Sequence, residues 1–220
     1  MSDVDTLEVA ELFHSLQGEG LDSGLPTSFV RLAGCNLRCG YCDTTFAQTV
    51  DSDTPQMTIP AILDKLNFWN CREVMVTGGE PLLQKGTCDL LQALVEMGYR
   101  VTLETNGSFD LAGVPAAVIR SVDVKTPGSG EVDSFRLANL QLLQPDDQLK
   151  FVCVDEEDIN WALSFISEYR LTDSCAVIMQ PGWESVSLEL MAKRIVASGL
   201  PVRLGLQLHK IIWGENSQGV

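Results

Sequence analysis

Short β-rich segments recur along this chain of 220 residues, and patterns typical of helices separate them. The β-rich segments cover 27–34, 73–79, 100–107, 121–128, 148–155, 176–182 and 201–210, and most end in Gly, Pro, Asn or Asp. The clearest helical patterns cover 82–98, 156–169 and 183–199. Strands that alternate with helices form parallel sheets through right-handed crossovers. We therefore expect an α/β fold in which about six βα units build a partial, incomplete TIM-like barrel with a parallel sheet.

The expected ends of these strands are polar and rich in glycine. Four of them read TGGEP, ETNGS, DVKTPGSG and MQPGW. In barrels of this kind the chemistry takes place at the C-terminal ends of the strands. We therefore expect these four segments to face one common cavity.

Composition and charge narrow the class of protein and of partner. The chain is 45% hydrophobic and 20% charged, and it has neither low-complexity segments nor repeats, so we expect one domain over 1–220. Its net charge of −15 repels phosphate backbones and anionic lipid, which predicts a small ligand, no nucleic acid and no membrane as partners. The amino terminus lacks the features of a signal peptide, and no apolar run approaches the roughly 20 residues of a membrane helix, so we expect a cytoplasmic protein.

Three of the seven cysteines lie close together in the segment GCNLRCGYCDT. Cys35, Cys39 and Cys42 are separated by three and then two residues, directly after the first expected strand. Thiolates at such short spacing favour a zinc ion or an iron–sulfur cluster. A structural zinc site normally has four ligands, and no fourth Cys or His follows at a suitable spacing. Three thiolates leave one coordination position open, where a substrate or cofactor can bind.

This spacing, with an aromatic residue before the third cysteine, resembles the signature of radical S-adenosylmethionine enzymes. In that superfamily three cysteines hold a 4Fe–4S cluster, whose unique iron binds the amino and carboxylate groups of S-adenosylmethionine. The resemblance implies that Cys35, Cys39 and Cys42 hold such a cluster. It also implies that Tyr41 and Asp43 lie at the cofactor.

A second segment, MVTGGEP at 75–81, ends the next expected strand. Its residues Gly78, Gly79 and Glu80 resemble the GGE motif of the same superfamily. Glycines let the backbone approach a ligand closely, and a carboxylate or carbonyl there can accept hydrogen bonds from the methionyl ammonium group.

The segment from 11 to 44, which contains SLQGEG and FVRLAGC, closely resembles the start of the 7-carboxy-7-deazaguanine synthase family. The resemblance continues through TGGEP, LETNG, DVKTPGSG, LKFV, MQP and LHK, and so covers nearly the whole chain. It implies an abbreviated barrel without an auxiliary-cluster domain, and therefore a single radical S-adenosylmethionine domain over 1–220. The implied reaction converts 6-carboxy-5,6,7,8-tetrahydropterin to 7-carboxy-7-deazaguanine with loss of ammonia, a carbon–nitrogen lyase step of queuosine and deazapurine biosynthesis.

The family's motif positions imply three sets of contacts. Those expected at the substrate are Leu16, Gln17, Gly18, Arg31, Thr77 and His209, with the Arg31 guanidinium on the substrate carboxylate and His209 at the end of the last expected strand. Those expected at S-adenosylmethionine are Tyr41, Cys42, Asp43, Gly79, Glu80, Asp123, Val124, Lys125 and Gln180. Thr44 occupies the position where the family binds Mg²⁺, a cation that commonly takes only one or two protein oxygens.

The resemblance also implies a mechanism and partners. One electron from the reduced cluster would cleave S-adenosylmethionine to methionine and a 5′-deoxyadenosyl radical. That radical would take the hydrogen from carbon six of the pterin, whose ring then contracts. The implied partners are a second copy of the chain in a homodimer and an external one-electron reductant such as flavodoxin.

Two other interpretations remain open from the sequence. One is a radical-activating enzyme that acts on a glycine of a partner protein, and the other is a binding module that carries zinc or a cluster. Residues outside the motifs have structural interpretations: we expect His14 to be structural and the remaining cysteines to be buried thiols, namely Cys71, Cys88, Cys153 and Cys175.

Overall fold

The computed structural model describes residues 6–215 and 217–220, and its centre is one sheet of nine strands. The strands are β1 (Thr6–Leu16), β2 (Pro26–Leu32), β3 (Gln56–Thr58), β4 (Glu73–Gly78), β5 (Arg100–Thr105), β6 (Ile119–Asp123), β7 (Gln148–Cys153), β8 (Ala176–Pro181) and β9 (Arg203–Leu204). The helices are α1 (Ile59–Trp69), α2 (Thr87–Glu96), α3 (Glu156–Glu168), α4 (Leu188–Ser198) and α5 (Leu208–Trp213). Residues 1–5, which belong to the terminus used for the cytoplasmic prediction, lie outside the described residues.

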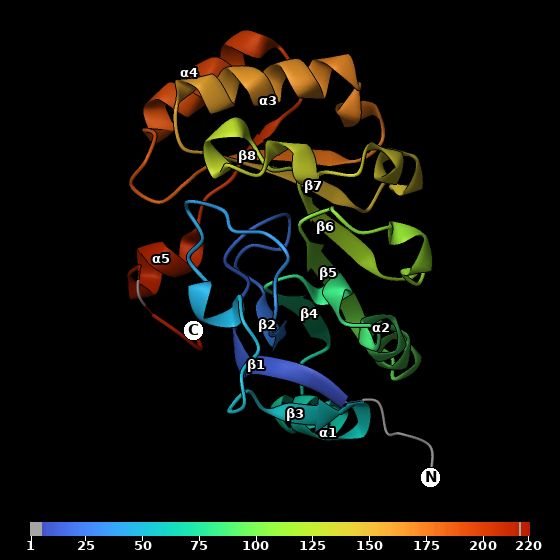
Figure 1. Ribbon diagram of the computed structural model, residues 1–220. Helices are drawn as coiled ribbons and strands as arrows, with labels where there is room; N and C mark the ends of the chain where they lie inside the picture. Colours follow the sequence, from blue (N-terminus) through green and yellow to red (C-terminus); the bar gives the residue numbers. More distant parts are fainter. Residues whose placement is uncertain (1–5, 216) are drawn as a thin grey trace.

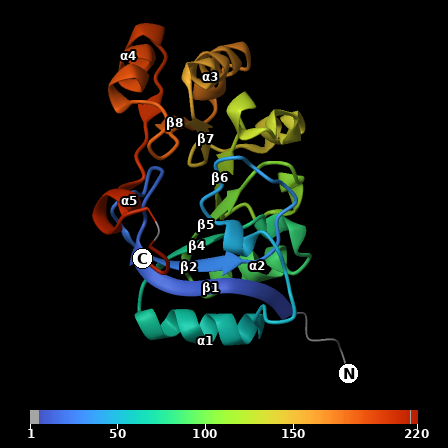
Figure 2. The same cartoon turned by 60° about the vertical axis from the view of Figure 1, so that its left-hand side comes forward.

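The strand order is β3-β1-β2-β4-β5-β6-β7-β8-β9, and the strands from β2 to β9 pair in parallel. Only β1 is antiparallel to its neighbours β2 and β3. The sheet starts at β3 and stops at β9 without closing on itself (Figures 1 and 2). This arrangement confirms the expected partial barrel with a parallel sheet.

The helices begin and end at residues suited to those positions. The Thr58 hydroxyl accepts a hydrogen bond from the first turn of α1, and Asn70 ends that helix in the left-handed conformation. The Asp155 carboxylate caps α3 in the same way. The acidic run 155–158 therefore lies at a helix N-terminus, where carboxylates interact favourably with the positive end of the helix dipole. Ser187 caps α4, and Gly199 ends it.

The two faces of the sheet differ in polarity. Successive strand residues point to opposite faces, and on one face residues such as Val76, Leu103 and Phe151 join the core with apolar residues of α1 to α4. Figures 1 and 2 show α1 beside β1 and α3 beside β7 and β8, on the outside of the curved sheet. Each fully buried Leu of this core contributes about 1.5 to 3 kcal/mol. The other face carries charged and polar side chains, and these line the inside of the partial barrel.

Two segments differ from the sequence expectation. The segment 201–210, expected as one strand, forms only the two-residue strand β9 and then begins α5. The N-terminal segment, which is not among the expected strands, forms β1, the longest strand of the described residues.

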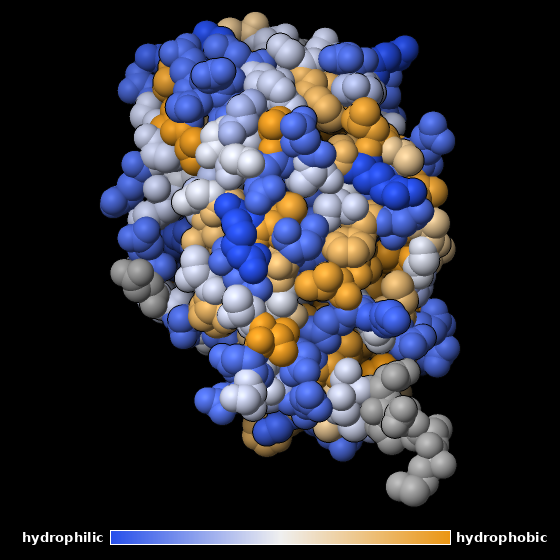
Figure 3. Space-filling view, viewed as in Figure 1, coloured by the Kyte–Doolittle hydropathy of each residue, from blue (hydrophilic) through white to orange (hydrophobic). Residues whose placement is uncertain are grey.

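The surface mixes hydrophilic and hydrophobic residues, as the face in Figure 3 shows. Among the described residues, no helix is both long and apolar enough to cross a bilayer.

Candidate active site at the open ends of the strands

The three clustered cysteines lie in the loop that follows β2. Its backbone is held at both ends, because Gly34 N–H donates to Ala47 (2.8 Å) and Gly40 N–H donates to Ser129 (3.0 Å). The Cys35 sulfur accepts a hydrogen bond from the backbone N–H of Leu37 at 3.4 Å. All three thiols are free and partly exposed, so this loop offers sulfur ligands to the opening of the barrel.

Burial and the neighbouring charges set the electrostatics of these thiols. Burial raises the pKa of the thiols of Cys35 and Cys39, their mutual repulsion with Cys42 adds to this, and Lys125 opposes it. Within the described part of the chain, no three His, Cys, Asp or Glu side chains lie close enough together to hold one metal ion. A 4Fe–4S cluster does not need such convergence, because each of its irons takes a separate thiolate.

Two glycines, Gly78 at the end of β4 and Gly79 directly after it, pack closely against neighbouring backbone, Gly78 against β2 and Gly79 against the cysteine loop. A Cβ on Gly79 would lie 2.8 Å from both Ala47 O and Cys35 Cβ. A Cβ on Gly78 would lie 2.9 Å from Leu32 N. The absence of side chains therefore lets the end of β4 fix the cysteine loop.

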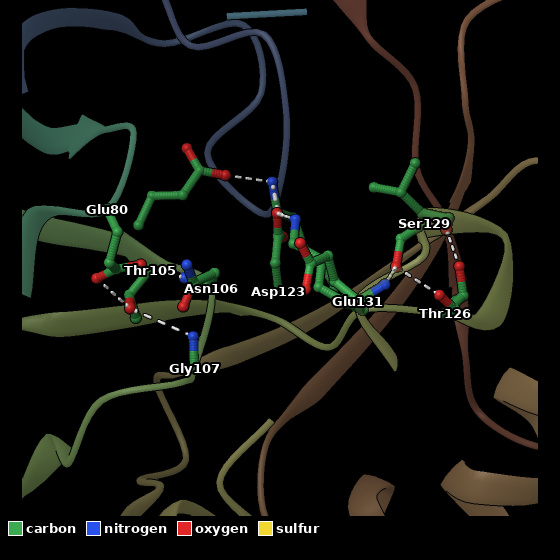
Figure 4. A network of polar contacts seen from close by, with 12 residues as sticks. Glu80, Thr105, Asn106, Gly107, Asp123, Thr126, Ser129 and Glu131 are labelled. Carbon is green, nitrogen blue, oxygen red and sulfur yellow. Dashed lines mark hydrogen bonds and ion pairs between the residues drawn. The ribbon is translucent and has the colours of Figure 1, made fainter. Parts of the chain in front are cut away.

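Glu80 fixes the end of β5. It is fully buried, and its carboxylate accepts hydrogen bonds from Leu82 N–H (3.0 Å), Asn106 N–H (2.7 Å) and the Thr105 hydroxyl (2.8 Å). Figure 4 shows Glu80 beside Thr105 and Asn106. Burial raises the pKa of Glu80, and these donors oppose that rise. These three donors hold the Glu80 carboxylate toward the end of β5.

Several predicted cofactor residues carry buried polar atoms without a hydrogen-bond partner in the described chain. These atoms are Tyr41 Oη, Asp123 Oδ1 and Gln180 Oε1, of which Asp123 Oδ1 still lies 3.3 Å from Lys150 Nζ in an ion pair. Lys125 lies between two of these residues, because its Nζ pairs with Asp123 at 3.1 Å and lies 5.9 Å from the centre of the Tyr41 ring. Buried polar atoms normally have partners, so these residues fit a site that binds a polar ligand.

Val124 differs from its neighbours Asp123 and Lys125. Its side chain is 1% exposed, and its N–H donates to Lys150 O at 2.8 Å. The Val124 side chain therefore belongs to the hydrophobic core.

Arg31 lies on the inner face of β2, opposite Thr77 of β4 in the parallel register. Its Nε donates to Glu11 at 2.9 Å, and its guanidinium lies 5.7 Å from the centre of the Phe13 ring and 6.0 Å from that of Phe46. Neither Nη group donates a hydrogen bond within the described residues. The edge of the guanidinium that carries the two Nη groups is therefore available for a carboxylate, while Glu11 holds the Nε group.

The predicted substrate residues after β1 meet the C-terminal segment. The His209 ring packs so closely on Gly18 that a Cβ there would lie 2.8 Å from His209 Cγ, and Leu208 N–H donates to Gly18 O at 2.8 Å. Leu16 ends β1, and the buried Gln17 side chain contacts Met75 Sδ at 3.1 Å. His209 belongs to the first turn of α5 and not to a strand end, which corrects its expected placement. Burial lowers the pKa of His209, so its imidazole favours the neutral form.

Asp43 and Thr44 are held by each other and by α5. The Thr44 hydroxyl donates to Asp43 at 3.0 Å, and Lys210 Nζ pairs with Asp43 at 2.6 Å. Burial opposes ionisation of Asp43, but the hydrogen bond from Lys210 holds its pKa below the usual range. A neighbouring carboxylate adds an oxygen that suits a hard cation beside Thr44.

Three charged residues at the centre of the site, Lys150, Glu19 and Glu104, were absent from the sequence expectation. Lys150 of β7 forms ion pairs with Glu19, Glu104 and Asp123. The sequence carried a signal for two of them, because Lys150 in LKFV and Glu104 in LETN are charged residues within apolar strand segments. A buried charge of this kind needs a partner of opposite charge.

The four cysteines outside the cluster were expected to be buried, and two of them are. Cys153 and Cys175 are buried as expected, whereas Cys71 and Cys88 are partly exposed. His14 lies on β1, where its ring stacks on Trp69 and its Nδ1 contacts the Ser28 hydroxyl at 3.3 Å.

Comparison with known proteins agrees with this geometry. Residues 29–120 match the model of the radical SAM superfamily. The chain is 40% identical to the 7-carboxy-7-deazaguanine synthase of Chlorobaculum tepidum, with 100% of both chains covered. It is 38% identical to that of Koribacter versatilis, over 97% of this chain and 100% of that one.

A solved structure supports the fold. The crystal structure of QueE from Escherichia coli matches with a TM-score of 0.75 at 21% identity, covering 93% of this chain and 95% of that chain. Identity and coverage of the curated relatives together show that this chain belongs to the 7-carboxy-7-deazaguanine synthase family of radical S-adenosylmethionine enzymes.

Proposed function

We propose that the chain is a carbon–nitrogen lyase that converts 6-carboxy-5,6,7,8-tetrahydropterin to 7-carboxy-7-deazaguanine by radical ring contraction. The observation that carries this function is the full-length identity to several curated 7-carboxy-7-deazaguanine synthases. The open-ended barrel agrees with it, because the cysteine loop after β2, Arg31, Thr77 and Asp123 all lie at or next to the C-terminal ends of its strands. The whole chain acts as one domain in this proposal, which the continuous sheet and its single core support.

The cofactors are a 4Fe–4S cluster and S-adenosylmethionine, as in the superfamily. We assign the cluster to Cys35, Cys39 and Cys42. The residues that we assign to S-adenosylmethionine are Tyr41, Cys42, Asp43, Gly79, Glu80, Asp123, Val124, Lys125 and Gln180, with Gly79 and Val124 acting through backbone groups. Once bound, the two cofactors supply a 5′-deoxyadenosyl radical.

The chain's own residues orient the substrate. The free edge of Arg31 binds the substrate carboxylate, and Thr77 lies beside it on the next strand. Gln17 and Gly18 border the opposite side together with His209, whose neutral imidazole can donate or accept one hydrogen bond. The phenyl rings of Phe13 and Phe46 limit water at the guanidinium, which strengthens its pairing with an anion.

Replacing Arg31 by alanine should weaken substrate binding by roughly 1.5 to 3 kcal/mol, the scale of a charge-assisted hydrogen bond. Cleavage of S-adenosylmethionine without substrate should remain, because Arg31 does not contact the cysteine loop through hydrogen bonds. Anaerobic isothermal titration gives the affinity, and chromatography of 5′-deoxyadenosine gives the uncoupled cleavage. Unchanged affinity would remove Arg31 from the substrate site.

Three further assignments belong to the proposal. Mg²⁺ binds at Thr44, supported by the adjacent Asp43 carboxylate. A homodimer forms, supported by the exposed Ile211 and Ile212 side chains of α5, and an external reductant such as flavodoxin supplies the electron. The protein acts in the cytoplasm, where a reducing environment keeps its free cysteines reduced.

An anaerobic assay with carboxytetrahydropterin tests the reaction. We expect 7-carboxy-7-deazaguanine to form, and release of 5′-deoxyadenosine without it would favour an activating enzyme that acts on a glycine of a partner protein. Metal analysis after anaerobic reconstitution addresses the third interpretation. About one zinc with no iron or sulfide would identify a binding module instead.

A further inference from the structure

Lys150 is a buried cation at the point where three strands and a loop meet. Its side chain is 2% exposed, and it lies in the LKFV segment of β7, to which the proposed function gives no role. Its Nζ lies 2.7 Å from Glu19 Oε2 and 3.3 Å from Asp123 Oδ1, and it also pairs with Glu104. The three carboxylates come from the loop after β1, from β6 and from β5, so one ammonium group joins three separate elements.

The charges of this cluster do not balance. Lys150 and Lys125 supply two positive charges, whereas Glu19, Glu104 and Asp123 supply three negative ones, a sum of −1. Burial opposes ionisation of Glu19 and Asp123, but Lys150 holds the pKa of both below the usual range. Burial raises the pKa of Glu104 even beside Lys150, so this carboxyl is the one that most readily holds a proton.

The cluster touches both halves of the proposed site. Glu19 directly follows Gly18 and accepts a hydrogen bond from Gln207 at 3.0 Å. Glu104 accepts one from the Thr77 hydroxyl at 3.4 Å, on the substrate side. Asp123 belongs to the cofactor side through Lys125. Loss of Lys150 would leave these carboxylates to repel one another or to take up protons, and either response changes their positions.

We propose that Lys150 is a positioning residue that fixes Glu19, Glu104 and Asp123 and offsets their charge, so that an anionic substrate can bind among them. This inference rests on the proposed function, because it takes the ligand to be a carboxylated pterin. Lys150 acts through the carboxylates, which is why we do not call it catalytic.

The test compares Lys150→Met with Arg120→Met as a matched control. Arg120 of β6 is also a buried cation, 5% exposed, and it pairs with Asp147 at 3.2 Å away from the proposed ligands. Both variants remove one buried positive charge, and both should unfold at a lower temperature. In anaerobic titration with carboxytetrahydropterin, K150M should bind at least about tenfold more weakly, whereas R120M should stay within about twofold of the parent. Equal affinity losses in the two variants, or none in K150M, would overturn the proposal.

A second variant separates positioning from stability. K150M/E104Q removes one carboxylate along with the cation, and it should recover part of the affinity that K150M loses. If K150M/E104Q recovers none of the lost affinity, the proposal that Lys150 offsets the charge of the carboxylates is overturned. If K150M does not fold, E104Q becomes the reference. The double variant should then bind the carboxylated pterin more weakly than E104Q does. Equal affinity of the two would overturn the proposal that Lys150 fixes Glu19 and Asp123.

The Arg31→Ala variant, measured in the same titration, distinguishes failure of the proposed function from failure of the role proposed for Lys150. If neither R31A nor K150M weakens binding of the carboxylated pterin, the substrate assignment is at fault. If R31A weakens binding and K150M does not, the proposed function stands and the role of Lys150 fails.

Discussion

The variants Cys35→Ala, Cys39→Ala and Cys42→Ala should each lose cleavage of S-adenosylmethionine altogether. Three thiolates already form the smallest set that holds the cluster and leaves one iron open, so the loss of any one is not compensated by a neighbour. The described residues offer no substitute, because no other cysteine shares the loop. Iron and sulfide analysis after anaerobic reconstitution, together with release of 5′-deoxyadenosine, measures the effect.

Cys153→Ala is the matched control for these variants. Cys153 is fully buried, and desolvation raises the pKa of its thiol, so it remains protonated in the core and binds no metal. Its replacement should cost only about 1 kcal/mol of stability and leave cluster content unchanged. Equal loss of iron in Cys153→Ala and Cys35→Ala would show that the wrong thiols were assigned.

Gly79→Ala should have the second large effect, because its methyl group has no space. The new Cβ would meet the backbone carbonyls of Gly34 and Ala47 and the Cβ of Cys35. Backbone atoms cannot rotate away as a flexible side chain does, so the cysteine loop must shift. We expect a stability loss of about 1 to 3 kcal/mol and a lower iron content per chain, measured by thermal unfolding and metal analysis.

Gly86→Ala provides the comparison for this steric argument. Neither glycine has a positive φ, and a Cβ on Gly86 would come no closer than 3.4 Å to Leu7 Cδ2. The change should leave iron content at the parental level. A similar loss of iron in both variants would mean that Gly79 acts by some means other than close packing.

Much of the architecture was predictable from local pattern. The apolar runs that became β4, β5, β7 and β8 carry their own signal, and their order with the helices predicts parallel pairing. The short strand β3 carries no such signal, because only pairing with β1 defines it, and the strand expected over 201–210 shortens to β9. Strand β1 was harder to predict because its alternation is interrupted at Ala10 and Glu11, where its register with β2 shifts.

The candidate site divides in the same way. Cys35, Cys39 and Cys42 are neighbours in the sequence, so their chemistry can be inferred from spacing alone. The partners of Lys150 are 27, 46 and 131 positions away, and only the order of the strands and the path of the loop after β1 bring them together. The hydrogen bonds of the Glu80 carboxylate have the same origin, since they join the end of β4 to the end of β5.

The contacts between α5 and the loop after β1 have a consequence for synthesis of the protein on the ribosome. Gln207 and Glu19 are 188 positions apart, and Leu208 closes on Gly18. A chain emerges from its N-terminus, so the Glu19 loop is made long before the helix that covers it. This side of the pocket therefore cannot be completed until α5 has left the ribosome, whereas the cysteine loop and β4 can already pack together during translation.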